Sequence, residues 1–180
     1  MKKFIGNILK VGSLKSDRGV SEDFKYSLEN ADDFQSIFEL IKRIVKRVLG
    51  RERAGLMLFL ADLPAEIGAF HGLGSNSIVM NRRILEALRR SGRNRVEVNS
   101  YIFVILLHEY LHSLGYVDEH LTRRLVYKIV AEVFGRDHPA TRMAVEGPRR
   151  FLDRLDLIPV EERPPELVKE FDPTYQRYIH

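Results

Sequence analysis

Cysteine and tryptophan are absent from this chain of 180 residues, and it has no long hydrophobic run. Without cysteine the chain cannot form disulfide bonds or thiolate metal sites, although this says little about its compartment. The longest apolar runs, "GLMLFLA" and "YIFVILL", fall far below the roughly 20 residues that a membrane-spanning helix needs. We therefore expect no membrane partner.

The composition is that of a soluble globular protein, with 44% hydrophobic and 30% charged residues. A length of 180 residues predicts one domain with a substantial core. The opening "MKKFIGNILKVGS" has an apolar region too short for a signal peptide, so we expect a cytoplasmic protein. The net charge of +4 permits an anionic partner without requiring one.

Hydrophobic periodicity divides the chain into helix and strand signals. We expect helices over 31–50, 82–90, 96–114, 118–134 and 149–158, and strands over 55–64, 66–74 and 76–81. Asn81 is placed to cap the helix that follows it. Residues 1–21 and 159–180 are predicted to be extended terminal segments. The order of elements predicts an α+β fold in which a small mixed sheet packs against helices.

The segment "LLHEYLHSLGYVDEH", residues 106–120, places two histidines and a glutamate at the end of a strongly apolar helix. His108 and His112 are four residues apart, so they share one helical face and both imidazoles can reach one metal ion. Glu109 lies beside the pair, where it can hold a metal-bound water. This H-E-x-x-H pattern on a helix is typical of two zinc ligands and a general base. The alternative is a pair of helix-end histidines satisfied by hydrogen bonds in the core.

Gly115 extends the pattern, because it ends the helix and lets the chain turn back toward the histidines. The stretch "HEYLHSLGYVD" resembles the metzincin clan of zinc peptidases, whose motif is H-E-x-x-H-x-x-G-x-x-H. Here Asp118 stands at the third-ligand position, as aspartate does in the snapalysin-type branch. The resemblance covers about a dozen residues. It implies a zincin-like fold with an edge strand over the cleft, and one Zn²⁺ per chain held by His108, His112 and Asp118.

Three other residues compete with Asp118 as the third ligand. His120 is chemically a better match for zinc but lies off the family spacing, and Glu119 sits in the first turn of the next helix. Glu132 has the separation from His112 that resembles the thermolysin-like gluzincins. About 20 Å of helix would separate Glu132 from the histidines, so we discount it.

Further residues have roles that the resemblance suggests. Met143 could form the methionine turn that lies beneath the metal in metzincins, or it could simply be a core residue. Tyr116 is a candidate for stabilising the tetrahedral intermediate, although most tyrosines at helix ends only pack. His71, on the predicted edge strand, could point into the cleft. That strand could also accept a substrate peptide as one more strand.

The sequence favours a zinc-dependent peptidase that uses Glu109 as its base and takes a peptide or protein substrate. The alternative is a zinc-dependent endoribonuclease, because bacterial rRNA-maturation enzymes have a similar H-x-x-x-H-x-x-G-Y…H motif. Their second motif position is typically glycine, whereas here it is Glu109, so a nucleic-acid partner is less favoured. A third reading is a zinc-stabilised binding scaffold. The arginine-rich stretch 81–95 could contact phosphates, but we expect it to be the solvated face of a helix and its turn.

Overall fold

A computed structural model describes residues 18–153, 155–157, 159 and 163–172 of the chain. Its helices are α2 (Arg18–Glu29), α3 (Phe34–Leu49), α4 (Arg82–Arg90), α5 (Arg95–Ser113), α6 (Glu119–Phe134), α7 (Pro139–Glu146) and α8 (Pro148–Phe151). Its strands are β1 (Met57–Ala61), β2 (Ala69–His71), β3 (Ser77–Asn81) and β4 (Glu166–Leu167). The predicted α+β fold is confirmed. None of the described helices has the length and apolarity that crossing a membrane requires.

The four strands form one small mixed sheet in the order β2-β3-β1-β4. Strands β1 and β3 are parallel, while β2 pairs antiparallel with β3 and β4 pairs antiparallel with β1. Strand β2 is therefore an edge strand, as the sequence predicted for this segment. The Asn81 side chain accepts a hydrogen bond from the Arg83 N–H at the start of α4, so the predicted helix cap is also confirmed.

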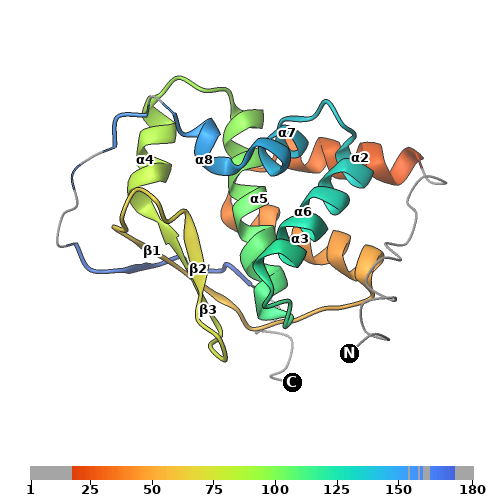
Figure 1. The fold of residues 1–180 in the computed structure, drawn as a ribbon, viewed down its shortest axis with the longest axis horizontal. Helices are drawn as coiled ribbons and strands as arrows, with labels where there is room; N and C mark the ends of the chain where they lie inside the picture. The colour runs from red at the N-terminus through yellow and green to blue at the C-terminus, as the bar shows by residue number, and fades with distance from the viewer. Residues whose placement is uncertain (1–17, 154, 158, 160–162, 173–180) are drawn as a thin grey trace.

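Helix α5 is the central element, and it contacts β2 as well as helices α2, α3, α6, α7 and α8. Figure 1 shows it in the middle of the molecule, with the sheet at one side and most of the helices gathered at the other. Asn94 is the N-cap of α5, and its side chain accepts a hydrogen bond from the Glu97 N–H. Since almost every face of α5 meets another element, its middle is apolar all round, and residues such as Phe103, Leu106 and Leu107 are completely buried.

Two of the predicted segments differ from the structure. Residues 18–21 were expected to be extended, but α2 begins at Arg18 and packs on α5 through Leu28 and its neighbours. The helix predicted over 149–158 is a single turn, α8, and residues 152–157 are not helical wherever they are described. Residues 1–17 lie outside the described part of the chain.

The described part of the C-terminal segment, residues 163–172, contains the short strand β4 and a turn at residues 169–170, and it is anchored at both ends. Arg163 forms ion pairs with the buried carboxylate of Asp62. At the other end, the buried Asp172 pairs with Lys42 and accepts from the Gly55 N–H. Between these anchors β4 pairs with β1 and covers that edge of the sheet. Strands β2 and β4 are thus the two edge strands of the sheet, and β2 is the one that contacts α5.

The arginine-rich stretch 81–95 is largely engaged with the protein, so the expectation of a solvated face holds only in part. Arg82 and Arg83 are each 8% exposed, and Arg82 pairs with Asp62. Arg83 and Arg93 donate to backbone carbonyl groups. Arg89, Arg90 and Arg95 are exposed, and Arg95 forms an ion pair with Asp32. This distribution does not resemble a surface arranged for phosphate contacts.

His138 begins α7 by an unusual cap, and its ring is almost completely buried. Its Nδ1 accepts a hydrogen bond from the Ala140 N–H, so the neutral ring carries its proton on Nε2, which lies 3.7 Å from the Glu29 carboxylate. Protonation of Nδ1 would break the cap. Burial, together with the nearby charges of Lys25 and Arg142, lowers the pKa of His138 to about 4.

We therefore expect the free energy of unfolding to fall as the pH is lowered from 6.5 to 4. In that window the unfolded chain binds a proton that the folded chain excludes, so His138 contributes a loss on the order of 2–3 kcal/mol. Urea unfolding of the wild type and of His138→Asn, across this pH range, measures the effect. Asparagine keeps a capping side chain but does not titrate. A variant with the same pH dependence as the wild type would contradict this role of His138.

Candidate metal centre and its cleft

The two motif histidines lie at the C-terminal end of α5, where the chain leaves the core. Gly115 follows with φ of +93°, a conformation that favours glycine, and it turns the chain back along the helix. Arg51 and Arg53 donate to the carbonyl groups of Leu114 and Ser113, which would otherwise lack partners at the helix end. The end of α5 is thus bound by two arginines from the loop between α3 and β1, which is distant in sequence.

Three ligand atoms converge at this helix end. The Nε2 atoms of His108 and His112 lie 3.0 Å apart, and Glu119 Oε2 lies 3.3 Å from each of them. Zinc bonds of 2.0–2.1 Å in a tetrahedron place the ligand atoms about 3.3–3.4 Å from one another. The geometry therefore fits three ligands of one tetrahedral ion. Among the described residues, this is the one group of three His, Asp or Glu side chains with such convergence.

The surrounding residues orient the three side chains for this role. His112 Nδ1 lies 2.7 Å from the Tyr116 carbonyl oxygen, so the ring donates there and Nε2 keeps its lone pair for a metal. Arg123 donates to the other carboxylate oxygen of Glu119 at 2.8 Å. Burial lowers the pKa of His108, which keeps that imidazole neutral, as a metal ligand must be.

Asp118, the expected third ligand, has a different place in the structure. It is the N-cap of α6, and its carboxylate accepts from the Leu121 N–H at 2.7 Å. The neighbouring Glu119 is the residue that the fold brings to the histidines. His120 is exposed, and neither it nor Glu132 belongs to the converging group. Of the four candidates weighed from the sequence, Glu119 is the one that lies with both histidines.

Glu109 lies beside the two histidines and is only 7% exposed. Burial raises the pKa of its carboxyl to about 7, against the opposing influence of His112 and of the His71 backbone N–H, which donates to it. Unlike Glu119, Glu109 is not one of the converging ligands. A carboxylate with a pKa near neutrality is suited to accept and then release a proton.

The metal group opens into a cleft of about 530 Å³. Its floor is α5, where Tyr101, Val104, Ile105, His108 and Glu109 face it. One wall comes from residues 65–69 at the start of β2, and the opposite walls come from α6 and from residues 144–152 of α7 and α8. The edge strand therefore borders the cleft, as the sequence predicted.

Sequence analysis suggested roles near the metal group for Met143, Tyr116 and His71. Met143 is buried within helix α7, so it is a core residue there and does not form a turn beneath the metal group. The Tyr116 ring lies against the Arg51 guanidinium, and its carbonyl oxygen is the part that reaches His112. His71 donates a hydrogen bond from Nδ1 to the Ser77 carbonyl oxygen. Burial lowers the pKa of His71.

Two residues of the site were not identified from the sequence. The position of Arg123 could have been inferred from local sequence, because a residue four positions after Glu119 on α6 lies on the same helical face as Glu119. For Tyr101 the one sequence signal is its helical spacing from His108, which is seven residues or about two turns. Because many core residues have such a spacing, it does not identify Tyr101 as a site residue.

No protein-family model, curated protein or solved structure matches this chain. The candidate site therefore rests on the chain's own sequence and geometry.

Proposed function

We propose that this protein is a zinc-dependent peptidase whose metal ligands are His108, His112 and Glu119. The observation that carries the proposal is the convergence of three ligand atoms at tetrahedral spacing, beside a buried carboxylate that is not itself a ligand. Zinc suits a site of two imidazoles and one carboxylate, and three protein ligands leave a fourth position open for chemistry.

Each residue has a defined task in this proposal. Bound zinc supplies Lewis acidity, which lowers the pKa of water and polarises a substrate carbonyl group. Glu109 accepts the proton of the attacking water and passes it to the leaving amine. The Tyr116 carbonyl and Arg123 hold His112 and Glu119 in orientation, so the ligands need no rearrangement before reaction.

Strand β2 offers the substrate backbone a place to bind. The Gly68 carbonyl accepts from the Asn81 N–H, which directs the backbone groups of Gly68 and Phe70 toward β3. In an antiparallel pair these directions alternate, so Ala69 and His71 direct theirs away from β3, to the outer edge of the sheet. The His71 N–H donates to Glu109 there. A peptide added at this edge would pass directly beside the proposed base.

The charges that line the cleft favour a peptide over an RNA substrate. Apart from the proposed metal group, Glu66 and Glu146 face the cleft, against Arg149 and against Arg123, which is already paired with Glu119. Binding a phosphate backbone requires an excess of positive charge, which these side chains do not supply. Purified protein can be tested with casein and a fluorogenic peptide library, beside a structured RNA. Cleavage of RNA without cleavage of any peptide would favour the endoribonuclease alternative.

The third ligand is tested by comparing Glu119→Gln with Asp118→Asn. We expect Glu119→Gln to lower zinc affinity by at least about tenfold, because a neutral amide replaces an anionic ligand. Asp118→Asn should leave zinc affinity almost unchanged, because asparagine caps a helix nearly as well as aspartate. Competition with a chromophoric chelator measures both.

His120→Ala serves as the matched control, since His120 is an exposed histidine beside the group. If Asp118→Asn or His120→Ala releases zinc while Glu119→Gln retains it, the assignment of Glu119 is wrong.

A further inference from the structure

The hydroxyl of Tyr101 is buried and has no hydrogen-bond partner within the described part of the protein. The residue is 1% exposed. Leaving a buried hydroxyl without a partner costs about 1–3 kcal/mol, and a phenylalanine at this place would avoid that cost. A hydroxyl in this position is therefore best explained by a partner that binds there.

Tyr101 lies on the floor of the cleft that contains the proposed metal centre. It stands two helical turns before His108, about 10 Å along α5. The side chains between and around the two residues are largely apolar, with Val104, Ile105 and Val126 among them. The cleft thus has an apolar section that leads away from the metal group, and the buried Tyr101 hydroxyl lies directly behind the lining at its far end.

Glycine at position 68 leaves the space beside the buried Tyr101 hydroxyl free of a side chain. A Cβ atom there would lie 3.1 Å from the Tyr101 hydroxyl oxygen and 3.1 Å from Ile105 Cδ1. Any larger residue at the start of β2 would press on both groups. Because residue 68 is glycine, the backbone before β2 can approach α5 closely, and no side chain at position 68 lies against the Tyr101 hydroxyl.

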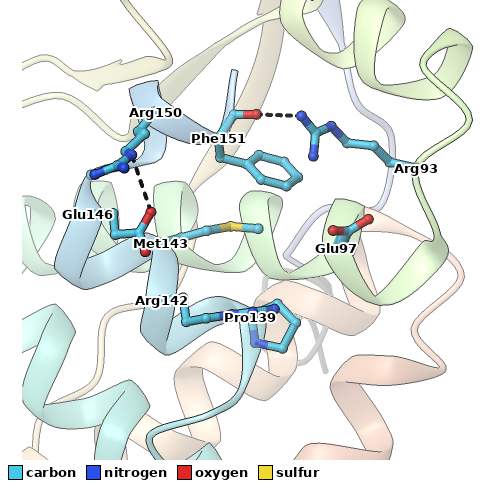
Figure 2. Close-up of a pocket in the computed structure, with 9 residues that line it drawn as sticks. Arg93, Glu97, Pro139, Arg142, Met143, Glu146, Arg150 and Phe151 are labelled. Carbon is cyan, nitrogen blue, oxygen red and sulfur yellow. Dashed lines mark hydrogen bonds and ion pairs between the residues drawn. The ribbon is translucent and has the colours of Figure 1, made fainter. Parts of the chain in front are cut away.

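The Tyr101 ring is held in place by a wall of aromatic and cationic groups. It stacks on Phe151 with 6.0 Å between centroids. The Arg93 guanidinium carbon lies 4.0 Å from the centroid of the Phe151 ring, and Arg93 donates to the Phe151 carbonyl at 2.7 Å. Figure 2 shows Phe151 and Arg93 together in a second cavity, of about 310 Å³, which Tyr101 does not line. Tyr101 thus lines the cleft and its stacking partner Phe151 lines the second cavity.

We propose that Tyr101 is a specificity-determining residue, and that the cleft takes a long, uncharged substrate side chain with a hydrogen-bonding tip, glutamine above all. This inference rests on the proposed peptidase function. The side chain belongs to the substrate residue next to the bond that is cleaved. Its methylene groups contact Val104 and Ile105, and its amide bonds to the Tyr101 hydroxyl.

The chemistry of the pocket selects glutamine among the long side chains. Burial raises the pKa of Tyr101 well above its ordinary value, so the hydroxyl stays neutral and can both donate and accept. A primary amide also does both. Lysine and glutamate of similar length would bring an unpaired charge against apolar walls, which is costly. Methionine has a similar length and shape but only a weak acceptor at its sulfur.

The test compares paired peptides that differ only in glutamine or methionine at the position next to the scissile bond. We expect wild-type protein to cleave the glutamine peptide with about tenfold higher kcat/KM. Tyr101→Phe keeps the stacked ring and removes only the hydroxyl, so this ratio should fall toward one. Tyr26→Phe, at an exposed tyrosine, is the matched control and should keep the wild-type ratio.

The possible results separate the two proposals. Cleavage of both peptides with no preference, or a preference that survives in Tyr101→Phe, overturns the role of Tyr101 and leaves the peptidase intact. A lower Tm of Tyr101→Phe with an unchanged ratio also overturns it, since the hydroxyl would then be structural. If wild-type protein with a full equivalent of zinc cleaves no peptide in the library, the peptidase proposal fails, and the substrate assignment of Tyr101 fails with it.

Discussion

Glu109→Gln is expected to retain zinc and the wild-type fold while peptide hydrolysis falls by about 10²–10⁴-fold. The carboxylate is buried beside the histidines but does not belong to the converging ligands, so its loss should not release the metal. Glutamine has the same shape and can still accept from the His71 N–H. It cannot accept the proton of the attacking water. Fluorogenic peptide turnover and metal content, measured on the same preparation, check the two parts of this prediction.

Glu109→Asp is the informative companion, because aspartate keeps the base but shortens the side chain. We expect activity between that of Glu109→Gln and the wild type, since a misplaced base is less effective than a well-placed one. Wild-type turnover in Glu109→Gln would show that Glu109 is not the base. Loss of zinc in the same variant would show instead that Glu109 is a ligand.

The second large effect is expected from removing the metal. Wild-type protein should contain near one equivalent of zinc, and the His108→Ala, His112→Ala double variant should contain none. Bound zinc stabilises the fold by about 4 kcal/mol at a free concentration 1,000 times Kd. For a chain of this size that corresponds to roughly 10 °C in Tm. A chelator should therefore lower the Tm of the wild type and leave that of the double variant unchanged.

The controls for this prediction are already present in the chain. His120→Ala removes an exposed histidine next to the site and should change neither zinc content nor the response to the chelator. Full zinc occupancy in the double variant would contradict the assignment of the site. If zinc binds with one equivalent and no peptide is cleaved, the protein is better described as the zinc-stabilised scaffold.

The secondary structure near the site was predictable because its signals are local. The helix ending at Gly115, the cap at Asn81 and the edge strand around Phe70 each depend on a short run of residue types. The helical start of α2 and the pairing of β4 with β1 were not predicted, and both depend on distant partners. Helix α2 is stabilised by packing on α5 and α6, and β4 exists because β1 offers it an open edge. Neither partner can be read from the segment itself.

The sequence by itself determined that His108 and His112 share a helix face and that Glu109 stands beside them, because helical periodicity places residues four apart together. It could not determine which residue approaches them after the turn at Gly115. Asp118 and Glu119 are adjacent, and only the starting point and direction of α6 decide between them. In the folded chain the Asp118 side chain accepts from the Leu121 N–H at the start of α6, and the adjacent Glu119 lies against the histidines. The burial of the Tyr101 hydroxyl is likewise a property of the assembled cleft, since its walls come from β2, α5, α6 and the α7–α8 region.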